Sequence, residues 1–318
     1  MNRRPARVRG LGALALAAWL GLPFATSAQL RVAGNTSTLE LAPVLLAAEQ
    51  LGAQRLAVKN GGIPALFEAD AADLATNAET QALRQSVDHP DLRIVLTVAE
   101  GFYRVVARRS AGVRTLADLR GKNIATIATT SSGYYLHKML GTVGLSIDDV
   151  TVVPLNPLSK MPLALANREV DAVTIWEPEV QRAAEAIGAD AIEFQQVEGR
   201  TVYRELFNLN TTAANLANPA KRKQIVAFVR ALLTASAEIR QRPQIVWPLV
   251  AQSTGYDPAL IEKVWHHEGY PGSLVPDLLD VIVEEDVYIA RERGRAPRAR
   301  SELAMLIDAS VLREALAP

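Results

Sequence analysis

A run of hydroxyl-bearing residues separates a predicted strand from a predicted helix. The run is Thr129, Thr130, Ser131 and Ser132, and Gly133 and Tyr134 follow it directly. Hydroxyl groups and the unpaired backbone N–H groups of a helix N-terminus bind an anion or a polar headgroup without any basic side chain. Simple N-capping is the alternative, but one cap requires only one hydroxyl. The run therefore predicts a ligand cradle.

Two further polar segments follow predicted strands and are equivalent to this run in position. They are Asn35, Thr36, Ser37 and Thr38 after the first strand, and Thr76 and Asn77 after the third. Ligands of open α/β sheets bind beyond the carboxyl ends of the strands, so we expect all three segments at one site. A polar turn or a helix cap is the alternative for each. Thr76 with Glu79 three residues later fits a capping box, which predicts a helix to about residue 86.

Aromatic residues next to these segments are candidates for the walls of the site. The near-continuous apolar segment 170–176 predicts a strand buried on both faces, and Trp176 ends it. The Trp176 ring is expected to line the pocket, with core packing as the alternative. Tyr134 is expected to face the cleft, because Tyr135 lies closer to the apolar stripe of its helix through Met139. The pair His266-His267 is assigned a structural role, and no metal site is predicted.

The elements that must position these residues alternate between strand-like and helical patterns. This alternation predicts an α/β architecture with largely parallel sheets. After about residue 203 the chain has one further strand-like segment, 205–210, and is helical almost throughout from residue 219 onward. The order predicts two lobes: the chain leaves the first near Val105 and returns to it near Tyr203.

Composition limits the class of protein. The chain has 318 residues, equal numbers of basic and acidic residues at 34 each, and no cysteine. Balanced charge argues against a nucleic-acid partner, and the absence of cysteine excludes disulfides, thiolate metal sites and cysteine nucleophiles. Nucleotide-binding and hydrolase motifs are missing after residue 28 as well.

The first 28 residues have the pattern of a bacterial secretory signal. Four arginines and no acidic residue precede an apolar run at 11–24, and cleavage is expected after Ala28. The run is shorter than the ~20 residues that a membrane-spanning helix needs, although an uncleaved anchor is the alternative. Removing those four arginines from the 34 basic residues leaves a formal charge of about −4. The sequence thus predicts an exported protein.

Four segments in order carry a resemblance to a known family. They are 115–124 (TLADLRGKNI), 130–135 (TSSGYY), 144–153 (GLSIDDVTVV) and 167–178 (NREVDAVTIWEP). Together they resemble periplasmic solute-binding proteins of ABC importers, of the sulfonate, nitrate and taurine type, which share their fold with thiamine-pyrimidine proteins. The resemblance implies the two-lobed, type II Venus-flytrap fold with two crossover strands. It also implies that Trp176 lies near the cleft.

The resemblance also implies a domain organisation and partners. Lobe 1 is expected to comprise residues 29–105 and 204–318, and lobe 2 residues 106–203, with the ligand between them. The expected partners are a small-molecule ligand and an inner-membrane ABC permease with its cytoplasmic ATPase. We expect a periplasmic monomer without cofactor, metal or nucleic acid.

The function predicted from the sequence is the binding of a small organic anion by hinge closure, without catalysis. Sulfonates, nitrate, taurine and aromatic carboxylates are the expected ligands, although the strand-end loops contain no arginine and leave a neutral aromatic or pyrimidine solute open. An enzyme of pyrimidine or menaquinone-pathway type is one alternative, and its pyrimidine branch carries a cysteine-rich motif that this chain lacks. A ligand-sensing partner of a membrane receptor is the other.

Overall fold

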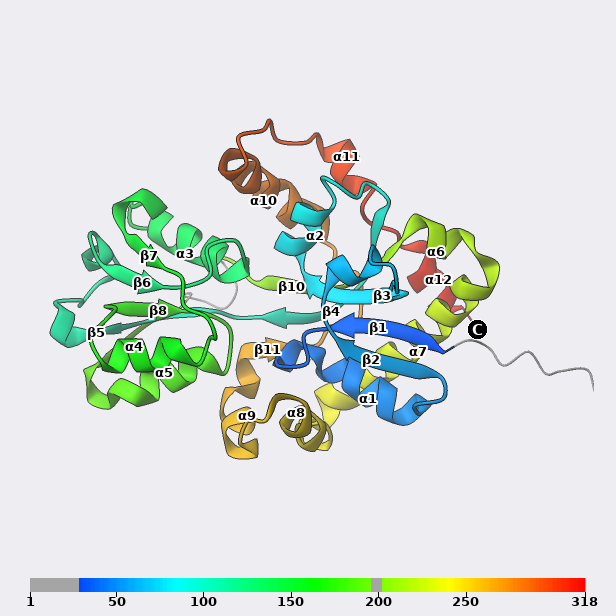
Figure 1. Ribbon diagram of the computed structural model, residues 1–318, viewed down its shortest axis with the longest axis horizontal. Helices are drawn as coiled ribbons and strands as arrows, with labels where there is room; N and C mark the ends of the chain where they lie inside the picture. The colour runs from blue at the N-terminus through cyan, green and yellow to red at the C-terminus, as the bar shows by residue number, and fades with distance from the viewer. Residues whose placement is uncertain (1–28, 196–201, 318) are drawn as a thin grey trace, which may run out of the picture.

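Two β-sheets, each covered by helices, lie side by side in the protein (Figure 1). The computed structural model describes residues 29–195 and 202–317, so the predicted signal at 1–28 lies outside the described residues. The larger sheet has the strand order β11-β4-β10-β3-β1-β2 and the smaller one the order β7-β6-β8-β5-β9. We call the larger sheet with its helices lobe 1 and the smaller one lobe 2. The predicted two-lobed α/β class is confirmed.

The strands of both lobes are short apart from the two that run toward the other lobe. Lobe 1 contains β1 (Leu30–Gly34), β2 (Leu56–Asn60), β3 (Leu74–Ala78), β4 (Leu92–Gly101), β10 (Glu205–Thr212) and β11 (Glu268–Gly269). Lobe 2 contains β5 (Arg104–Arg108), β6 (Asn123–Ala125), β7 (Thr151–Val153), β8 (Ala172–Thr174) and β9 (Ala191–Gln195). The chain passes from β4 into β5 within a few residues and re-enters lobe 1 at β10.

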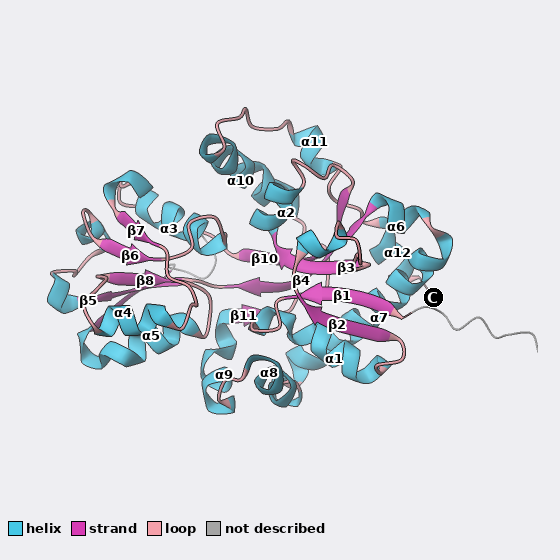
Figure 2. Ribbon diagram, in the orientation of Figure 1, coloured by secondary structure: helices cyan, strands magenta, loops and turns pink. Residues whose placement is uncertain are grey.

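Helices cover both faces of each sheet (Figure 2). Those of lobe 1 are α1 (Ala42–Leu51), α2 (Glu79–Gln85), α6 (Ala213–Ala217), α7 (Pro219–Gln241), α8 (Trp247–Thr254), α9 (Pro258–Val264), α10 (Leu278–Glu292), α11 (Arg300–Ala304) and α12 (Ser310–Leu316). Lobe 2 contains α3 (Ser131–Gly141), α4 (Lys160–Ala166) and α5 (Glu179–Ile187).

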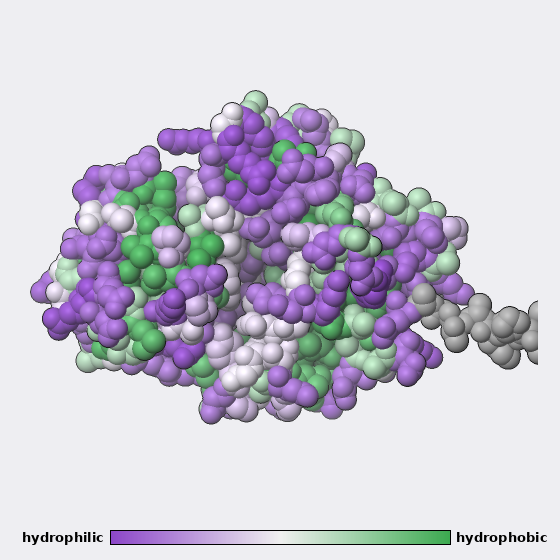
Figure 3. Space-filling model, in the orientation of Figure 1, coloured by the Kyte–Doolittle hydropathy of each residue, from purple (hydrophilic) through white to green (hydrophobic). Residues whose placement is uncertain are grey.

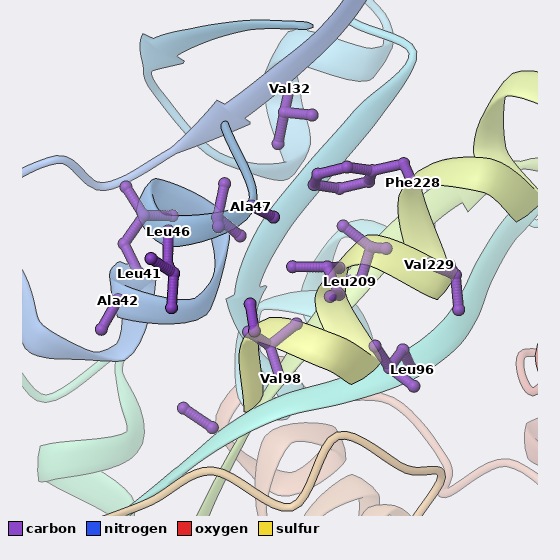
Figure 4. Packing of buried hydrophobic residues seen from close by; sticks show 14 of the residues in the cluster. Val32, Leu41, Ala42, Leu46, Ala47, Leu96, Val98, Leu209, Phe228 and Val229 are labelled. Atoms are coloured by element: carbon purple, nitrogen blue, oxygen red, sulfur yellow. The ribbon is translucent and has the colours of Figure 1, made fainter. Parts of the chain in front are cut away.

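Alternation of side chains along the strands explains the layers. In β1, Val32 belongs to the apolar cluster under α1, α7 and α12, whereas its neighbour Ala33 belongs to the cluster under α2, α10 and α11. Figure 4 shows the first cluster, where Phe228 of α7 lies over the sheet close to Leu209 of β10. In β8, Ala172 faces the cluster of α3 and Val173 faces that of α4 and α5. This confirms that the apolar strand is buried on both faces.

The sheets are mixed rather than largely parallel, which corrects the expectation from the sequence. Strand β1 pairs in parallel with β2 and β3, and β6 pairs in parallel with β7 and β8. Strand β10 is antiparallel to β3 and β4, and β5 is antiparallel to β8 and β9. The physical reason is the crossover: the chain runs out of lobe 1 along β4 and comes back along β10, so these neighbours have opposite directions.

The predicted capping box at Thr76 is wrong. Strand β3 continues to Ala78, and α2 begins only at Glu79. Asn77 and Ala78 pair with Asn208 and Phe207 of β10, a strand more than a hundred residues later in the chain. Within the described ranges, no helix is long and apolar enough to cross a membrane.

Candidate functional site

A cavity of about 320 Å³ lies between the lobes. Figure 3 shows the surface hollowed between lobe 2 on the left and lobe 1 on the right. Both lobes contribute to its lining, which consists of Asn35, Thr38, Glu40, Asn60, Gly61, Asn77, Ala78, Gln81, Thr130, Ser131, Trp176, Glu205 and Phe207. All three predicted strand-end segments reach this cavity, as the topology requires.

The loop after β1 contributes only two of its four predicted residues. Asn35 and Thr38 line the cavity, whereas Thr36 and Ser37 do not. Thr36 donates from its backbone N–H and its hydroxyl to Asn60 Oδ1, both at 3.2 Å, and the Ser37 N–H donates to Asn35 Oδ1 at 3.1 Å. The polar residues of this loop therefore build the turn as well as the wall.

At the end of β3, Asn77 lines the cavity and Thr76 does not. Thr76 is a fully buried strand residue, and its hydroxyl approaches the position that a Cβ on Gly34 would occupy. Asn77 Oδ1 accepts the Ala78 N–H at 2.9 Å. The lining role of this segment therefore belongs to Asn77.

In lobe 2, Thr130 and Ser131 line the cavity, whereas Thr129, Ser132 and Gly133 do not. The hydroxyls of Thr130 and Ser132 lie 2.9 Å apart, and Thr130 Oγ1 also donates to the Ile127 carbonyl at 2.7 Å. Two of the four hydroxyls, those of Thr130 and Ser132, are thus engaged within the loop and the start of α3, and Thr130 and Ser131 face the cleft.

Gly133 and Tyr134 do not line this cavity. A Cβ at Gly133 would lie 2.2 Å from the Ala128 carbonyl oxygen, so the glycine permits close packing of α3 on its preceding loop. Tyr134 is buried, with its ring 5.1 Å from that of Tyr203 and 5.2 Å from that of Tyr288 on α10. The expected cleft position of Tyr134 is corrected: the helix turns its ring toward α10, where it lines a second interlobe cavity of about 520 Å³.

Trp176 lines the cavity from lobe 2, as predicted, and Phe207 of β10 lines it from lobe 1. Sequence reasoning missed Phe207 and four polar lining residues: Glu40, Asn60, Gln81 and Glu205. The sequence context could have identified the two acids as candidates. Glu40 lies between Leu39 and Leu41, and Glu205 is the first residue of an otherwise uncharged strand. A charged residue in such an apolar context is either paired or functional.

Glu205 holds the crossover strand against lobe 2. Its Oε1 lies 3.1 Å from Ser131 Oγ and its Oε2 lies 3.0 Å from Tyr103 Oη, while those two hydroxyl oxygens lie 2.7 Å apart. If all three contacts are hydrogen bonds, they need three protons, and the hydroxyls of Ser131 and Tyr103 supply only two. The third contact has a proton of its own when the Glu205 carboxyl is protonated. In agreement, burial and then the negative charge of Glu40 and Glu79 raise the pKa of Glu205 well above its usual value.

Glu40 lies in the short 3-10 helix Leu39–Leu41 that follows the β1 loop. It is 2% exposed, and its Oε2 has no hydrogen-bond partner among the described residues. Burial raises the pKa of Glu40, although hydrogen bonds with its own backbone, Thr38 and Glu205 act in the opposite direction. No lysine, arginine or histidine is among the described residues that line the cavity. The cavity is therefore acidic.

Polar contacts join the lobes directly. Gln81 Nε2 on α2 donates to the Thr129 carbonyl at 2.8 Å, beside the cavity. Tyr256 Oη donates to Glu179 Oε1 at 2.8 Å, and the exposed Lys263 and Glu185 form an ion pair of 2.6 Å. The exposed ion pair between Lys263 and Glu185 is individually weak, whereas Tyr256 contacts a buried carboxylate, Glu179.

Solved structures with the same arrangement of lobes are binding proteins and an enzyme. The alkanesulfonate-binding protein SsuA from Xanthomonas axonopodis pv. citri, bound to MOPS, is 22% identical with a TM-score of 0.66, covering 88% of this chain and 98% of that one. The periplasmic aliphatic sulphonate binding protein SsuA from Escherichia coli is 16% identical with a TM-score of 0.70, over 86% and 91%. The desulfurization enzyme DSZB is 15% identical with a TM-score of 0.60, over 91% and 99%. This chain shares the two-lobed fold of these proteins.

Curated relatives match over shorter stretches. A Brucella abortus protein named "Putative binding protein" is 38% identical over 87 residues, which are 27% of this chain and 26% of that protein. A Haemophilus influenzae protein named "Putative thiamine biosynthesis protein" is 28% identical over 187 residues, 58% of this chain and 57% of that protein. The matches thus span about a quarter and just over half of these relatives' lengths.

The family model described as NMT1/THI5 like matches residues 56–245, which are more than half of the chain. That range contains β2 to β10 and both crossovers between the lobes. The chain belongs to the NMT1/THI5-like family.

Proposed function

We propose that this protein is the periplasmic solute-binding component of an ABC importer. It holds a small solute in the interlobe cavity and delivers it to an inner-membrane permease. The observation that carries the proposal is the cavity itself, which is built from strand ends and helix starts of both lobes in a member of this family. The signal-like residues 1–28 support export to the periplasm.

The mechanism is closure of the lobes around the solute. Thr130, Ser131 and Trp176 stand on lobe 2, and the remaining lining residues belong to lobe 1. A solute that contacts both walls binds the closed arrangement better than the open one and shifts the population toward it. In this scheme the lobes hinge where the chain passes from β4 into β5 and where it re-enters lobe 1 at β10.

Binding is favoured over catalysis by the chemistry of the lining. DSZB shows that an enzyme can share this fold, so fold alone does not decide the matter. The chain has no cysteine nucleophile, and Ser131, the cavity hydroxyl held by an acid, contacts Glu205 and Tyr103 rather than a histidine base. A nucleophile needs an adjacent general base, and among the described residues no histidine takes that position beside Ser131.

Closure is testable because the chain contains no native cysteine. The double variant Glu185→Cys/Lys263→Cys places one thiol on each lobe, at an exposed ion pair outside the cavity. A bound solute should accelerate crosslinking of the two thiols by a short bismaleimide, and Trp176→Ala in the same background should weaken that effect. A panel of anions, amines, amidines and neutral heterocycles serves as the solute set. Acceleration by no member of the panel would contradict the proposed function.

A further inference from the structure

The cavity lining contains a buried carboxyl oxygen, Glu40 Oε2, that has no hydrogen-bond partner among the described residues. The Glu40 side chain is only 2% exposed, and its Oε2 accepts no hydrogen bond within the described ranges. A carboxyl oxygen that is removed from water without a hydrogen-bond partner destabilises the protein. A solute that donates to this oxygen from inside the cavity removes that cost, whereas a solute that presents only acceptors does not.

The groups around Glu40 add negative rather than positive character. Those that interact electrostatically with it are Glu205 on β10, Glu268 on β11, Tyr103 ahead of β5, Tyr256 between α8 and α9, and Tyr270 after β11. Each of these groups is a carboxyl or a phenol, so each is either neutral or negatively charged. An anion placed here would oppose the ionisation of both lining acids, and no cationic side chain among the described lining residues would act as its counter-ion.

Only Glu40 of the two lining acids is available to a ligand. Glu205 spends both carboxyl oxygens on Ser131 and Tyr103, at 3.1 and 3.0 Å. The rings of Trp176 and Phe207 form part of the same wall. Aromatic faces attract cations and stack on planar groups. The partners for a solute therefore include the unsatisfied Glu40 Oε2, aromatic surface and the amide groups of Asn35, Asn60 and Asn77.

From this juxtaposition we propose that the solute presents a cationic nitrogen group, a protonated amine or an amidine, whose N–H donates to Glu40 Oε2. This inference rests on the proposed function and deepens it by giving the charge of the ligand. It replaces the organic anion expected from the hydroxyl-rich loops, because the hydroxyls of Thr130, Ser131 and Ser132 are paired within the protein.

The test uses two series of solutes that differ in charge but hardly in shape. They are benzamidine, benzamide and benzoate, and the smaller acetamidine, acetamide and acetate, with benzenesulfonate added as the anion closest to the relatives' ligands. Thermal shift and calorimetric titration are run on residues 29–318. In each series the amidine should stabilise the chain most and the carboxylate least. In buffers of different ionisation enthalpy, amidine binding should release protons, since the cation displaces a proton from Glu40.

Two variants separate the role of Glu40 from a general loss of negative charge. Glu40→Gln keeps the size of the side chain and should weaken amidine binding by ~10- to 100-fold, the value of a charge-assisted hydrogen bond. The matched control Glu262→Gln removes the same charge from an exposed site on α9 and should leave affinity unchanged. If Glu40→Gln does not fold, Glu40→Asp, which keeps the charge but withdraws the oxygen, should show the same loss.

The outcomes distinguish this inference from the proposed function. Tighter binding of benzoate or benzenesulfonate than of benzamidine, with accelerated crosslinking of the lobes, would leave a solute-binding protein and overturn the cationic ligand. Failure of both amidines to bind, or equal binding to Glu40→Gln and the native chain, would overturn it too. Failure of the whole solute panel to promote crosslinking would instead contradict the proposed function.

Discussion

Replacing Gly133 with alanine should weaken the fold at the point where lobe 2 meets the cleft. An added Cβ would lie 2.2 Å from the Ala128 carbonyl oxygen and 2.6 Å from both its carbonyl carbon and its Cα. These atoms belong to the backbone and cannot rotate away. The first turn of α3 and the preceding loop must therefore separate by about 1 Å before the contacts become ordinary.

Two opposing contributions set the size of the effect. Overpacking of a tight site costs ~1–3 kcal/mol, and the rigid backbone contact places Gly133→Ala at the upper end. Alanine is favoured over glycine inside a helix by ~1 kcal/mol. The shift also lengthens the 3.1 Å contact between Ser131 and Glu205. We expect the free energy of unfolding to fall by about 2 kcal/mol.

The same helix offers a matched control. A Cβ on Gly141, the last residue of α3, would meet no atom within 4 Å. Gly141→Ala should therefore be neutral or raise the free energy of unfolding by up to ~1 kcal/mol. Urea unfolding of residues 29–318 measures both variants, and an unchanged m-value shows that the stability itself has changed. If the two variants differ by less than about 0.5 kcal/mol, the argument from the Ala128 contact is refuted.

Two further predictions concern buried acids. Asp286 on α10 accepts hydrogen bonds from Arg295 and Arg298, which outweigh its burial and lower its pKa to about 2. Asp286→Asn should cost roughly 3 kcal/mol near neutral pH in urea unfolding, because two arginines lose their buried partner, and the loss should shrink as the pH falls from 3.8 toward 2. Burial, opposed by Arg104, raises the pKa of Glu177 from 4.5 to about 7. The native chain therefore holds a proton that the unfolded chain releases, and its free energy of unfolding should fall relative to that of Glu177→Gln between pH 4.5 and 7; parallel pH profiles would contradict this.

A local pattern was sufficient where the side chains of a strand themselves indicate its environment. The apolar segment ending at Trp176 predicted a strand buried on both faces, and β8 has this environment because helices cover both sides of its sheet. The end of β3 was not predictable in this way. The spacing of Thr76 and Glu79 is that of a capping box, but β3 extends further because Asn77 pairs with β10. A local pattern cannot predict a partner strand so distant in the chain.

The candidate site shows the same division between local and distant information. Asn35, Thr38 and Asn77 were identified because polar residues at strand ends are a local pattern. Glu40 and Glu205 are separated by more than 160 residues, and each looks like an isolated charge in an apolar segment. Their chemistry arises only when β10 carries Glu205 back into lobe 1 beside the β1 loop. The acidic character of the site could therefore not be predicted from the spacing of residues in the sequence.

The charge of the solute depends on which polar groups remain unsatisfied, and neither the number of hydroxyls nor the net charge of the chain reports that. Ser131 and Ser132 looked like donors for an anion, yet Ser131 lies within hydrogen-bond distance of Glu205 and Ser132 within that of Thr126 and Thr130. Once such donors are paired inside the protein, an anion would have to break those bonds and approach a buried carboxyl as well. A cation breaks none of them and satisfies Glu40 Oε2, a buried oxygen of the cavity lining that has no partner among the described residues. A fold shared with sulfonate-binding proteins is thus compatible with a ligand of opposite charge, because the strand-end residues rather than the sheets determine what the cleft accepts.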